Sequence, residues 1–471
     1  MALFNAEKPL MQLAPVNWQA SSLQKYDAPA PRYTSYPSAN QFLDSFNAKD
    51  YRQQLGVVGD NIAPLSLYLH VPFCRQNCFY CACNKIVTRD ANKVQRYIEA
   101  LRRELKLQGA LHGRRRVTQL HWGGGTPTYL ARSEMTQLMH EIGLHFNLDV
   151  SGEHDFSIEI DPRTVDVADI ALLRGLGFNR VSLGIQDFHL PVQRLINRVQ
   201  DYDQIEAITE AVRENGFDSL NFDLIYGLPG QTVETFKETL AKVVALSPDR
   251  IACYNYAHLP DRFPGQRAID IVDLPPPEEK LALMQLCGEY LQAHGYGYIG
   301  MDHFVKPDDS LAVAARNGLL QRNFQGYSTV LAPDTLGLGP SSISQLGGMY
   351  VQNASSLNDY CIALELGELA IARGYSMNVD DQIRRDIIMS LACHLSLDIN
   401  SLQKKYGISF FDSFVYELEE LAPFVDDGLI SIKPDGITVL NEGRLLIRSI
   451  CMAFDAFHRD EASRKIFSRS I

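Results

Sequence analysis

Four of the nine cysteines in this 471-residue chain lie within ten residues, in the segment HVPFCRQNCFYCACNK that starts at His70. Cys74, Cys78 and Cys81 have the spacing C-x3-C-x2-C, and Cys83 follows after one further residue. Thiolates are soft ligands that bind iron–sulfur clusters and zinc. Three thiolates can hold three irons of a [4Fe–4S] cluster, and the fourth iron then stays open to a small ligand. The segment therefore predicts a reactive iron–sulfur site.

Two other chemistries remain open for these thiols. Four thiolates could close a structural zinc site, although Cys81 and Cys83 are closer together than paired zinc ligands usually are. Zinc would also normally take its second pair of ligands from a distant segment. A thioredoxin-like C-x-x-C has the spacing of Cys78 to Cys81, but not the helix start that such a fold requires. The spacing favours the cluster over both.

The remaining cysteines are scattered among apolar neighbours, at Cys253, Cys287, Cys361, Cys393 and Cys451. We expect them to pack as small buried hydrophobic side chains. A disulfide framework is not expected in a long chain with an odd number of cysteines and no export signal.

Composition narrows the class of protein. Hydrophobic residues make up 46% and charged residues 21%, which is typical of a soluble globular chain. No apolar run approaches the roughly 18 residues of a membrane helix, and the first residues lack a basic segment followed by an apolar one. The net charge of -12 disfavours nucleic-acid binding. We expect a cytoplasmic protein that binds neither nucleic acid nor membrane.

From about residue 64, short β-branched or aromatic runs alternate with amphipathic stretches. The predicted strands are 66–71, 118–122, 156–160, 180–185, 220–225 and 251–256, with a further strand at 296–300. The predicted helices between them include 90–107, 133–146, 202–217 and 232–246. Such alternation predicts an α/β fold with a parallel sheet and right-handed crossovers. Six units suit an incomplete (β/α)6 TIM-like barrel better than a closed barrel of eight.

The chain divides into three parts. Residues 1–60 form an N-terminal arm, whose segment 28–42 has three prolines and three aromatic residues and should be extended. Residues 61–350 form the barrel. Residues 360–471 form a mostly helical, winged-helix-like domain, with helices at 382–397, 409–425 and 443–454. A hairpin at 428–440 should turn at a central Asp-Gly pair. The acidic run ELEELAPFVDDG makes DNA binding by this domain improbable.

The cysteine spacing after a first strand resembles that of the radical S-adenosylmethionine (SAM) superfamily. The closer resemblance is to the oxygen-independent coproporphyrinogen III oxidase (dehydrogenase) family. It is carried by PRYTSYP in the arm, YLHVPFC, C-x-C-NK, HWGGGTPTYL, SIEIDPR, GIQDF, NFDLIYGLPGQT, YNYAHLP, IGMDHF, RNFQGY and GRLLIRSICM. These motifs run from the arm to the C-terminal part. The arm, Cys83 and RNFQGY distinguish the family within the superfamily.

The resemblance implies a role for each matching residue. Cys74, Cys78 and Cys81 would bind the cluster, whose open iron binds SAM, and Cys83 would lie near it without binding iron. Gln325, His70 and Cys83 are the implied catalytic residues, with Phe324 beside the reacting groups. The family holds two SAM molecules. The first would contact Tyr68, Gly124, Glu159 and Ile343. The second would contact Tyr80, Ala82, Gly125, Thr126, Gln186, Arg198, Asp223 and Ala257. The family commonly has glycine at Ala82.

The implied reaction is anaerobic and occurs in haem biosynthesis. A reduced cluster cleaves SAM to a 5′-deoxyadenosyl radical, which takes hydrogen from two propionates of coproporphyrinogen III in turn. Loss of carbon dioxide gives the two vinyl groups of protoporphyrinogen IX. A reducing electron-donor protein and a monomeric enzyme are implied. The four substrate carboxylates need cations, for which Arg32, Lys85 and Arg89 are available, although a solvated surface role is favoured for the last two. The arm could cover the mouth of the barrel.

Three other functions are compatible with parts of this sequence. A haem-binding chaperone shares the fold, but such relatives usually lack the PRYTSYP arm and differ at Cys83. A methyltransferase of the same superfamily would transfer a methyl group instead of releasing carbon dioxide. A zinc-stabilised structural protein leaves the glycine run and the polar strand ends unexplained. The sequence favours the decarboxylating enzyme.

Overall fold

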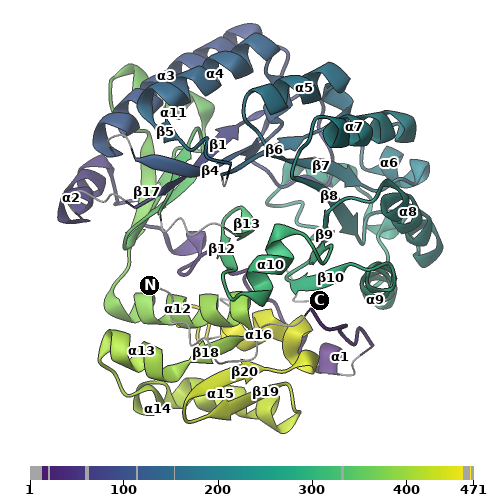
Figure 1. Cartoon of the computed structure of the whole chain (residues 1–471), viewed down its shortest axis with the longest axis vertical. Coiled ribbons are helices and arrows are strands. Elements are labelled where there is room, and N and C mark those ends of the chain that lie inside the picture. The colour runs from purple at the N-terminus through teal and green to yellow at the C-terminus, as the bar shows by residue number, and fades with distance from the viewer. Residues whose placement is uncertain are drawn as a thin grey trace.

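The structure, a computed structural model, describes residues 13–19, 22–58, 63–112, 115–152, 154–329, 334–459 and 467. A 13-stranded mixed sheet forms its centre. In Figure 1 the sheet curves, long helices form an arc around its outer side, and the C-terminal helices gather below it.

Six parallel strands form the core of the sheet and lie side by side in chain order. They are β1 (Leu65–Val71), β4 (Arg116–Gly124), β6 (Asp155–Ile160), β7 (Arg180–Gln186), β8 (Ser219–Tyr226) and β9 (Arg250–Asn255). The helices between and after them are α3 (Ala91–His112), α4 (Arg132–His145), α5 (Val167–Gly175), α6 (Leu190–Leu195), α7 (Tyr202–Glu214), α8 (Val233–Leu246) and α9 (Pro277–Ala293). All six strands match the predicted segments. Because they are parallel, the loops after them gather at one edge, where functional residues usually lie.

Both edges of the sheet depart from a simple repeat. The strand expected at 296–300 exists as β10 (Gly297–Gly300), but β11 (His303–Val305) lies between it and β9, and both pairings are antiparallel. It is therefore not a seventh parallel unit. Beyond β1, the sheet adds β14 (Asp334–Leu338), parallel to β1, and then the antiparallel β15 (Ile343–Leu346), β16 (Met349–Asn353) and β17 (Ile371–Ser376). The main sheet thus continues past residue 350.

The C-terminal part is mostly helical. It contains α12 (Val379–His394), α13 (Ile399–Tyr406), α14 (Phe410–Ser413), α15 (Val415–Asp426), a 3-10 helix (Asn441–Leu446) and α16 (Ile447–Met452). The helix expected at 409–425 is broken between α14 and α15, at Phe414. A small sheet has the order β18 (Ser396–Asp398), β20 (Gly436–Val439), β19 (Ile430–Lys433). The expected Asp-Gly turn is wrong: Lys433 pairs with Gly436, so the two loop residues are Pro434 and Asp435.

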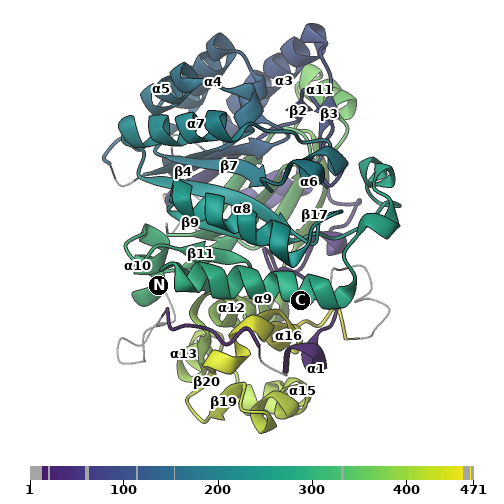
Figure 2. The same cartoon turned by 90° about the vertical axis from the view of Figure 1, so that its right-hand side faces the viewer.

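The arm is extended as expected, with a short 3-10 helix at Ala39–Gln41, but it is not a surface tail. Tyr33 and Tyr36 are almost fully buried. The Tyr33 hydroxyl donates to Asp455 Oδ2 at 3.1 Å, and Arg32 pairs with Asp302 at 2.7 Å. The arm therefore ties the sheet to the C-terminal helices. Figure 2 shows its purple start and α1 (Ser22–Tyr26) beside α16.

Two further expectations concern the scattered cysteines and membrane-spanning helices. The five scattered cysteines are all buried and free, which confirms their packing role. Among the described residues, no helix combines the length and the apolar character needed to cross a membrane.

Candidate active site

A cavity of about 410 Å³ runs along the inner face of the parallel strands. It extends from strand beginnings, at Asp155 and Arg180, to carboxyl ends, at Gly124 and Gln186. Thirteen of the sequence-predicted site residues line it: Cys74, Cys78, Tyr80, Cys81, Cys83, Gly124, Gly125, Thr126, Glu159, Gln186, Arg198, Asp223 and Gln325. Side chains separated by up to 251 positions in the sequence therefore face one space.

Two predicted residues lie just behind the cavity wall. The Tyr68 hydroxyl bonds to His70 Nδ1 at 3.0 Å, and His70 Nε2 bonds to the Asn84 carbonyl at 2.9 Å. A carbonyl can only accept, so His70 Nε2 carries the proton and Nδ1 accepts from the tyrosine. Burial lowers the pKa of His70, which keeps it neutral. His70 thus holds the end of the cysteine loop in place.

Three further predicted residues do not line the cavity. Ala82 is exposed between two cysteines. The carbonyls of Ala257 and Tyr80 both accept from Gln266 Nε2 at 3.1 Å, which joins the two backbones. Ile343 and Phe324 both pack against a separate apolar cluster of Phe42, Tyr350 and Met377.

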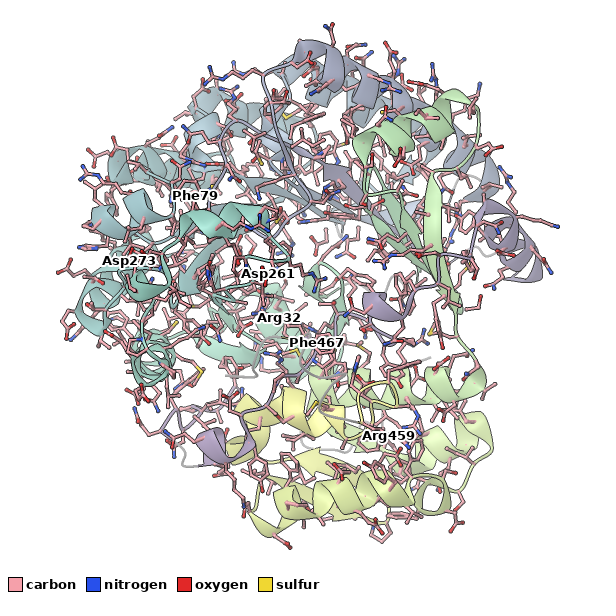
Figure 3. All side chains as sticks on the ribbon, turned by 180° about the vertical axis from the view of Figure 1, so that it is seen from behind. Arg32, Phe79, Asp261, Asp273, Arg459 and Phe467 are labelled. Carbon is pink, nitrogen blue, oxygen red and sulfur yellow. The ribbon has the colours of Figure 1, made fainter. Side chains whose placement is uncertain are left out.

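The cysteine loop is anchored to α6. Cys74 ends the short strand β2 (Phe73–Cys74), and Cys78 and Cys81 follow in a turn. The Phe79 amide donates to the Ile196 carbonyl at 3.0 Å, and the Phe79 ring (labelled in Figure 3) packs in the same apolar cluster as Ile196. The loop is therefore held in its middle by Ile196, at the end of α6, and beyond Cys83 by His70.

Two arginines meet the sulfur of Cys78. Arg163 Nη2 and Arg198 Nη1 each donate to Cys78 Sγ at 3.5 Å. Asp161 holds both cations, with Oδ2 at 2.6 Å from Arg163 and 3.1 Å from Arg198. Asp161 therefore holds two cationic donors against this sulfur. Sequence reasoning missed Arg163 and Asp161, although the motif SIEIDPR contains both.

The other loop thiols differ in environment. The Cys83 thiol, with help from Lys85, lowers the pKa of Cys81 to about 6. Lys85 Nζ also donates to the Cys81 carbonyl at 3.0 Å. Burial raises the pKa of Cys74 to about 11, and Thr126 Oγ1 lies 3.5 Å from its sulfur. A bound metal ion would deprotonate Cys74 outright.

The glycines at the end of β4 and just after it fit only because they lack a Cβ. Gly124 has φ +112°, and a Cβ there would lie 2.7 Å from the His70 ring. At Gly125 a Cβ would lie 2.7 Å from the Phe73 carbonyl oxygen. The Gly124 amide donates to Glu159 Oε2 at 3.3 Å. This close backbone approach leaves a smooth wall for a ligand beside the cysteine loop.

Polar groups on β6 and β8 and on the segment that contains Gln325 complete the cavity. Glu159 Oε1 lies 3.1 Å from His121 Nε2. Asp223 accepts from Ser182 Oγ at 2.8 Å and from Asn221 at 2.9 Å, and burial raises its pKa to about 6. Gln325 Nε2 is buried without a hydrogen-bond partner among the described residues. Such an orphaned donor suits a ligand acceptor.

The donor set fits an iron–sulfur cluster and SAM. Three thiols of one loop face a cavity with cationic donors on one side and a glycine wall on the other. In the described part of the chain, no three His, Cys, Asp or Glu side chains converge where a single metal ion could bind. Cluster thiolates bind different irons and do not need to converge.

Comparison with known proteins agrees with this geometry. The model of the radical SAM superfamily matches residues 68–243. The oxygen-independent coproporphyrinogen III oxidase of Pseudomonas aeruginosa is 47% identical over 97% of this chain and 99% of its own length. That of Escherichia coli strain K12 is 46% identical over 98% of this chain and 100% of its own. This chain belongs to the oxygen-independent coproporphyrinogen III oxidase family.

A solved structure supports the family fold. Coproporphyrinogen III oxidase from Escherichia coli, described as a radical SAM enzyme, matches with a TM-score of 0.89 and 45% identity over 94% of this chain and 100% of that one. The similarity extends over the arm and the C-terminal helices as well as the parallel strands. The radical SAM α/β fold is therefore common to this chain and its oxidase relative.

Proposed function

We propose that this protein catalyses the oxygen-independent oxidation of coproporphyrinogen III to protoporphyrinogen IX. Two propionates would each lose carbon dioxide and two electrons and become vinyl groups. One observation carries the proposal. Three cysteines, a glycine wall and strand-end carboxylates face one cavity, in a chain whose relatives of this name match it along nearly its whole length.

The cofactors would be a [4Fe–4S] cluster held by Cys74, Cys78 and Cys81, and two SAM molecules. When bound, these groups supply an electron and a carbon radical that abstracts hydrogen. Arg163 and Arg198 would stabilise the Cys78 thiolate. Cys83, beside the cluster, would not be a ligand.

The SAM contacts would come from both sides of the glycine wall. The first site is assigned to Tyr68, Gly124, Glu159 and Ile343, and the second to Tyr80, Ala82, Gly125, Thr126, Gln186, Arg198, Asp223 and Ala257. Four of these residues lie outside the cavity lining, namely Tyr68, Ala82, Ala257 and Ile343, so the proposal is least direct for them. The neutral His70 ring forms hydrogen bonds with the Tyr68 hydroxyl and the Asn84 carbonyl, and would thereby position the cysteine loop. Gln325 would donate its unpaired amide hydrogen to a ligand.

The architecture and context are part of the same proposal. The six parallel strands would form an incomplete (β/α)6 barrel within 61–350, with the arm at 1–60 and a winged-helix-like domain at 360–471. β17 lies past residue 360 but pairs with β16 in the main sheet, so the C-terminal domain would begin after β17. The protein would act as a cytoplasmic monomer, take electrons from a reducing donor protein, and bind neither nucleic acid nor membrane.

The test is anaerobic. The purified chain is reconstituted with iron and sulfide, reduced, and supplied with SAM and coproporphyrinogen III. We expect about four irons per chain, and protoporphyrinogen IX with 5′-deoxyadenosine among the products. Cys78→Ala should abolish SAM cleavage, whereas Cys361→Ala, a buried cysteine bonded only weakly to the Arg96 carbonyl, should retain it.

Two results would contradict the proposal. Zinc in place of iron would remove the cluster chemistry. A cluster that cleaves SAM but leaves coproporphyrinogen III intact, in a protein that binds haem tightly, would indicate a haem chaperone instead.

A further inference from the structure

A second, more open depression of about 1060 Å³ lies on the outer side of the cysteine loop. Arg75, Arg89 and Arg163 line it, together with Leu190 and Val199. Arg75 and Arg89 are exposed, and the two apolar side chains are 43% and 51% exposed. The depression is therefore a surface of cations around exposed apolar groups.

The wall between this depression and the cavity is one side chain thick. Gln76 and Asp161 line both spaces. Arg163 reaches across, with Nη1 at 2.9 Å from Gln76 Oε1 and Nη2 at 3.5 Å from Cys78 Sγ. A protein seated in the depression would touch Arg163, which itself touches a sulfur of the proposed cluster.

The charges of the depression do not cancel. Its carboxylates are already engaged: Asp161 pairs with Arg163 and Arg198, and Asp201 accepts the Asp203 amide at the start of α7. Among the described residues, neither Arg75 nor Arg89 forms an ion pair or side-chain hydrogen bond. The lining thus carries three arginines against two carboxylates, and two of those arginines have no partner in the described part of the chain, on this face of a protein whose net charge is -12.

We propose that this depression is the docking surface for an acidic one-electron carrier protein that reduces the cluster. The inference rests on the proposed function, because an external reductant is needed only if the cysteines hold a redox cofactor. One electron would leave the carrier, which is oxidised by one electron, and reach the cofactor bound to Cys78, which is reduced by one electron.

Physical chemistry favours such a partner over a neutral or basic one. Opposite charges speed association between protein surfaces, and electron-transfer encounters use small interfaces. An acidic protein as a whole would repel an acidic carrier, so a local cationic surface is what directs it to the cluster. The exposed Leu190 and Val199 would give the apolar contact at its centre.

The test uses the reconstituted, full-length enzyme and the double variant Arg75→Glu, Arg89→Glu. The probe is a purified acidic flavodoxin, fully reduced, and dithionite serves as the small-molecule reductant. Lys404→Glu with Lys433→Glu is the matched control, because it changes the charge equally on exposed residues of α13 and β19, which lie below the sheet in Figure 1. The measurements are the rate of cluster bleaching and its dependence on salt.

We expect the arginine variant to slow reduction by flavodoxin at least about tenfold at low salt, with a flatter salt dependence. Dithionite-driven reduction and SAM cleavage should stay unchanged in both variants. An unchanged flavodoxin rate in the arginine variant would overturn the docking surface, as would an equal loss with dithionite, which would indicate damage to the cluster. A wild-type enzyme that cannot cleave SAM with either reductant would instead overturn the proposed function.

Discussion

Arg198 Nη1 lies 3.5 Å from the sulfur of Cys78, although 120 residues separate the two in the chain. Its other terminal nitrogen donates to the Gly184 carbonyl at 2.5 Å, so the guanidinium is fixed between a strand end and the cysteine loop. Hydrogen bonds and positive charge at a cluster sulfur stabilise the reduced state. The pair would therefore couple the cavity wall at β7 to the reduction potential of the proposed cluster.

Replacing this arginine should make the cluster harder to reduce. In Arg198→Met we expect the midpoint potential to fall by about 60 mV, which is the one-electron equivalent of about 1.4 kcal/mol for a lost charge-assisted hydrogen bond. The potential is measured without SAM, by redox titration followed by electron paramagnetic resonance. Arg213→Met, which removes an exposed pair with Asp249, is the control. Equal potentials in all three proteins would show that Arg198 does not act on the cluster.

The glycine wall gives a steric prediction. In Gly125→Ala the new methyl group would meet the Phe73 carbonyl oxygen, which belongs to rigid backbone beside Cys74. Overpacking of this kind costs about 1–3 kcal/mol, so we expect a lower unfolding temperature and at least about tenfold weaker SAM binding. The control is Gly175→Ala in α5, where a Cβ meets nothing within 4 Å and should stabilise the helix by up to about 1 kcal/mol. Normal SAM binding by Gly125→Ala would contradict the assignment.

Local sequence signals accounted for the strands and the cysteine loop. Strands such as β1 (LSLYLHV) and β8 (SLNFDLIY) place apolar residues at alternate positions with polar or aromatic residues between them, and this pattern is visible in one segment alone. The thiols and the glycine run are likewise adjacent in the chain. These features could be predicted because neither depends on which distant segments meet.

Long-range pairing could not be predicted in the same way. No local pattern indicates that β14 lies beside β1, or that β11 separates β10 from β9. Arg163 was missed because its neighbour Cys78 is 85 residues away, and an arginine after a strand usually faces solvent. The hairpin turn was misplaced because Pro434 occupies the first loop position, which moves Gly436 into the paired strand.

The arm should influence coupling between SAM cleavage and product formation. Arg32, labelled near the centre of Figure 3, pairs with Asp302 and lies 5.4 Å from the ring centre of Tyr254, which lines the cavity. Arg32→Ala should admit water to this end of the cavity, since a closed site protects reactive intermediates. We expect the ratio of 5′-deoxyadenosine to protoporphyrinogen IX to rise at least about twofold.

Lys25→Ala is the matched control, because it also removes an ion pair formed by the arm, in this case with Asp427. Asp427 follows α15 in the C-terminal part and does not line the cavity. The ratio in Lys25→Ala should equal that of the wild type. A normal ratio in Arg32→Ala would mean that the arm has a purely structural role.

Glu104 predicts a pH dependence of stability. This fully buried carboxyl on α3 accepts from the Gly339 amide, Asn353 Nδ2 and the Tyr360 hydroxyl at 2.6–2.8 Å, and so fastens three segments beneath the sheet. Burial raises its pKa from 4.5 to about 7. The folded chain therefore keeps a proton that the unfolded chain loses. The stability that this proton confers is complete below about pH 4.5 and is lost as pH rises through about 7.

Comparison of the wild type with Glu104→Gln isolates this group, because every other titrating residue is shared. Across this range the wild type should lose up to about 3 kcal/mol relative to the variant, which cannot ionise. Urea unfolding at pH 5, 6, 7 and 8 measures the difference at each pH. As pH rises, the urea concentration at the unfolding midpoint of the wild type should fall toward or below that of Glu104→Gln. Parallel curves would mean that Glu104 is ionised in the folded protein throughout, with the three donors outweighing the cost of burial.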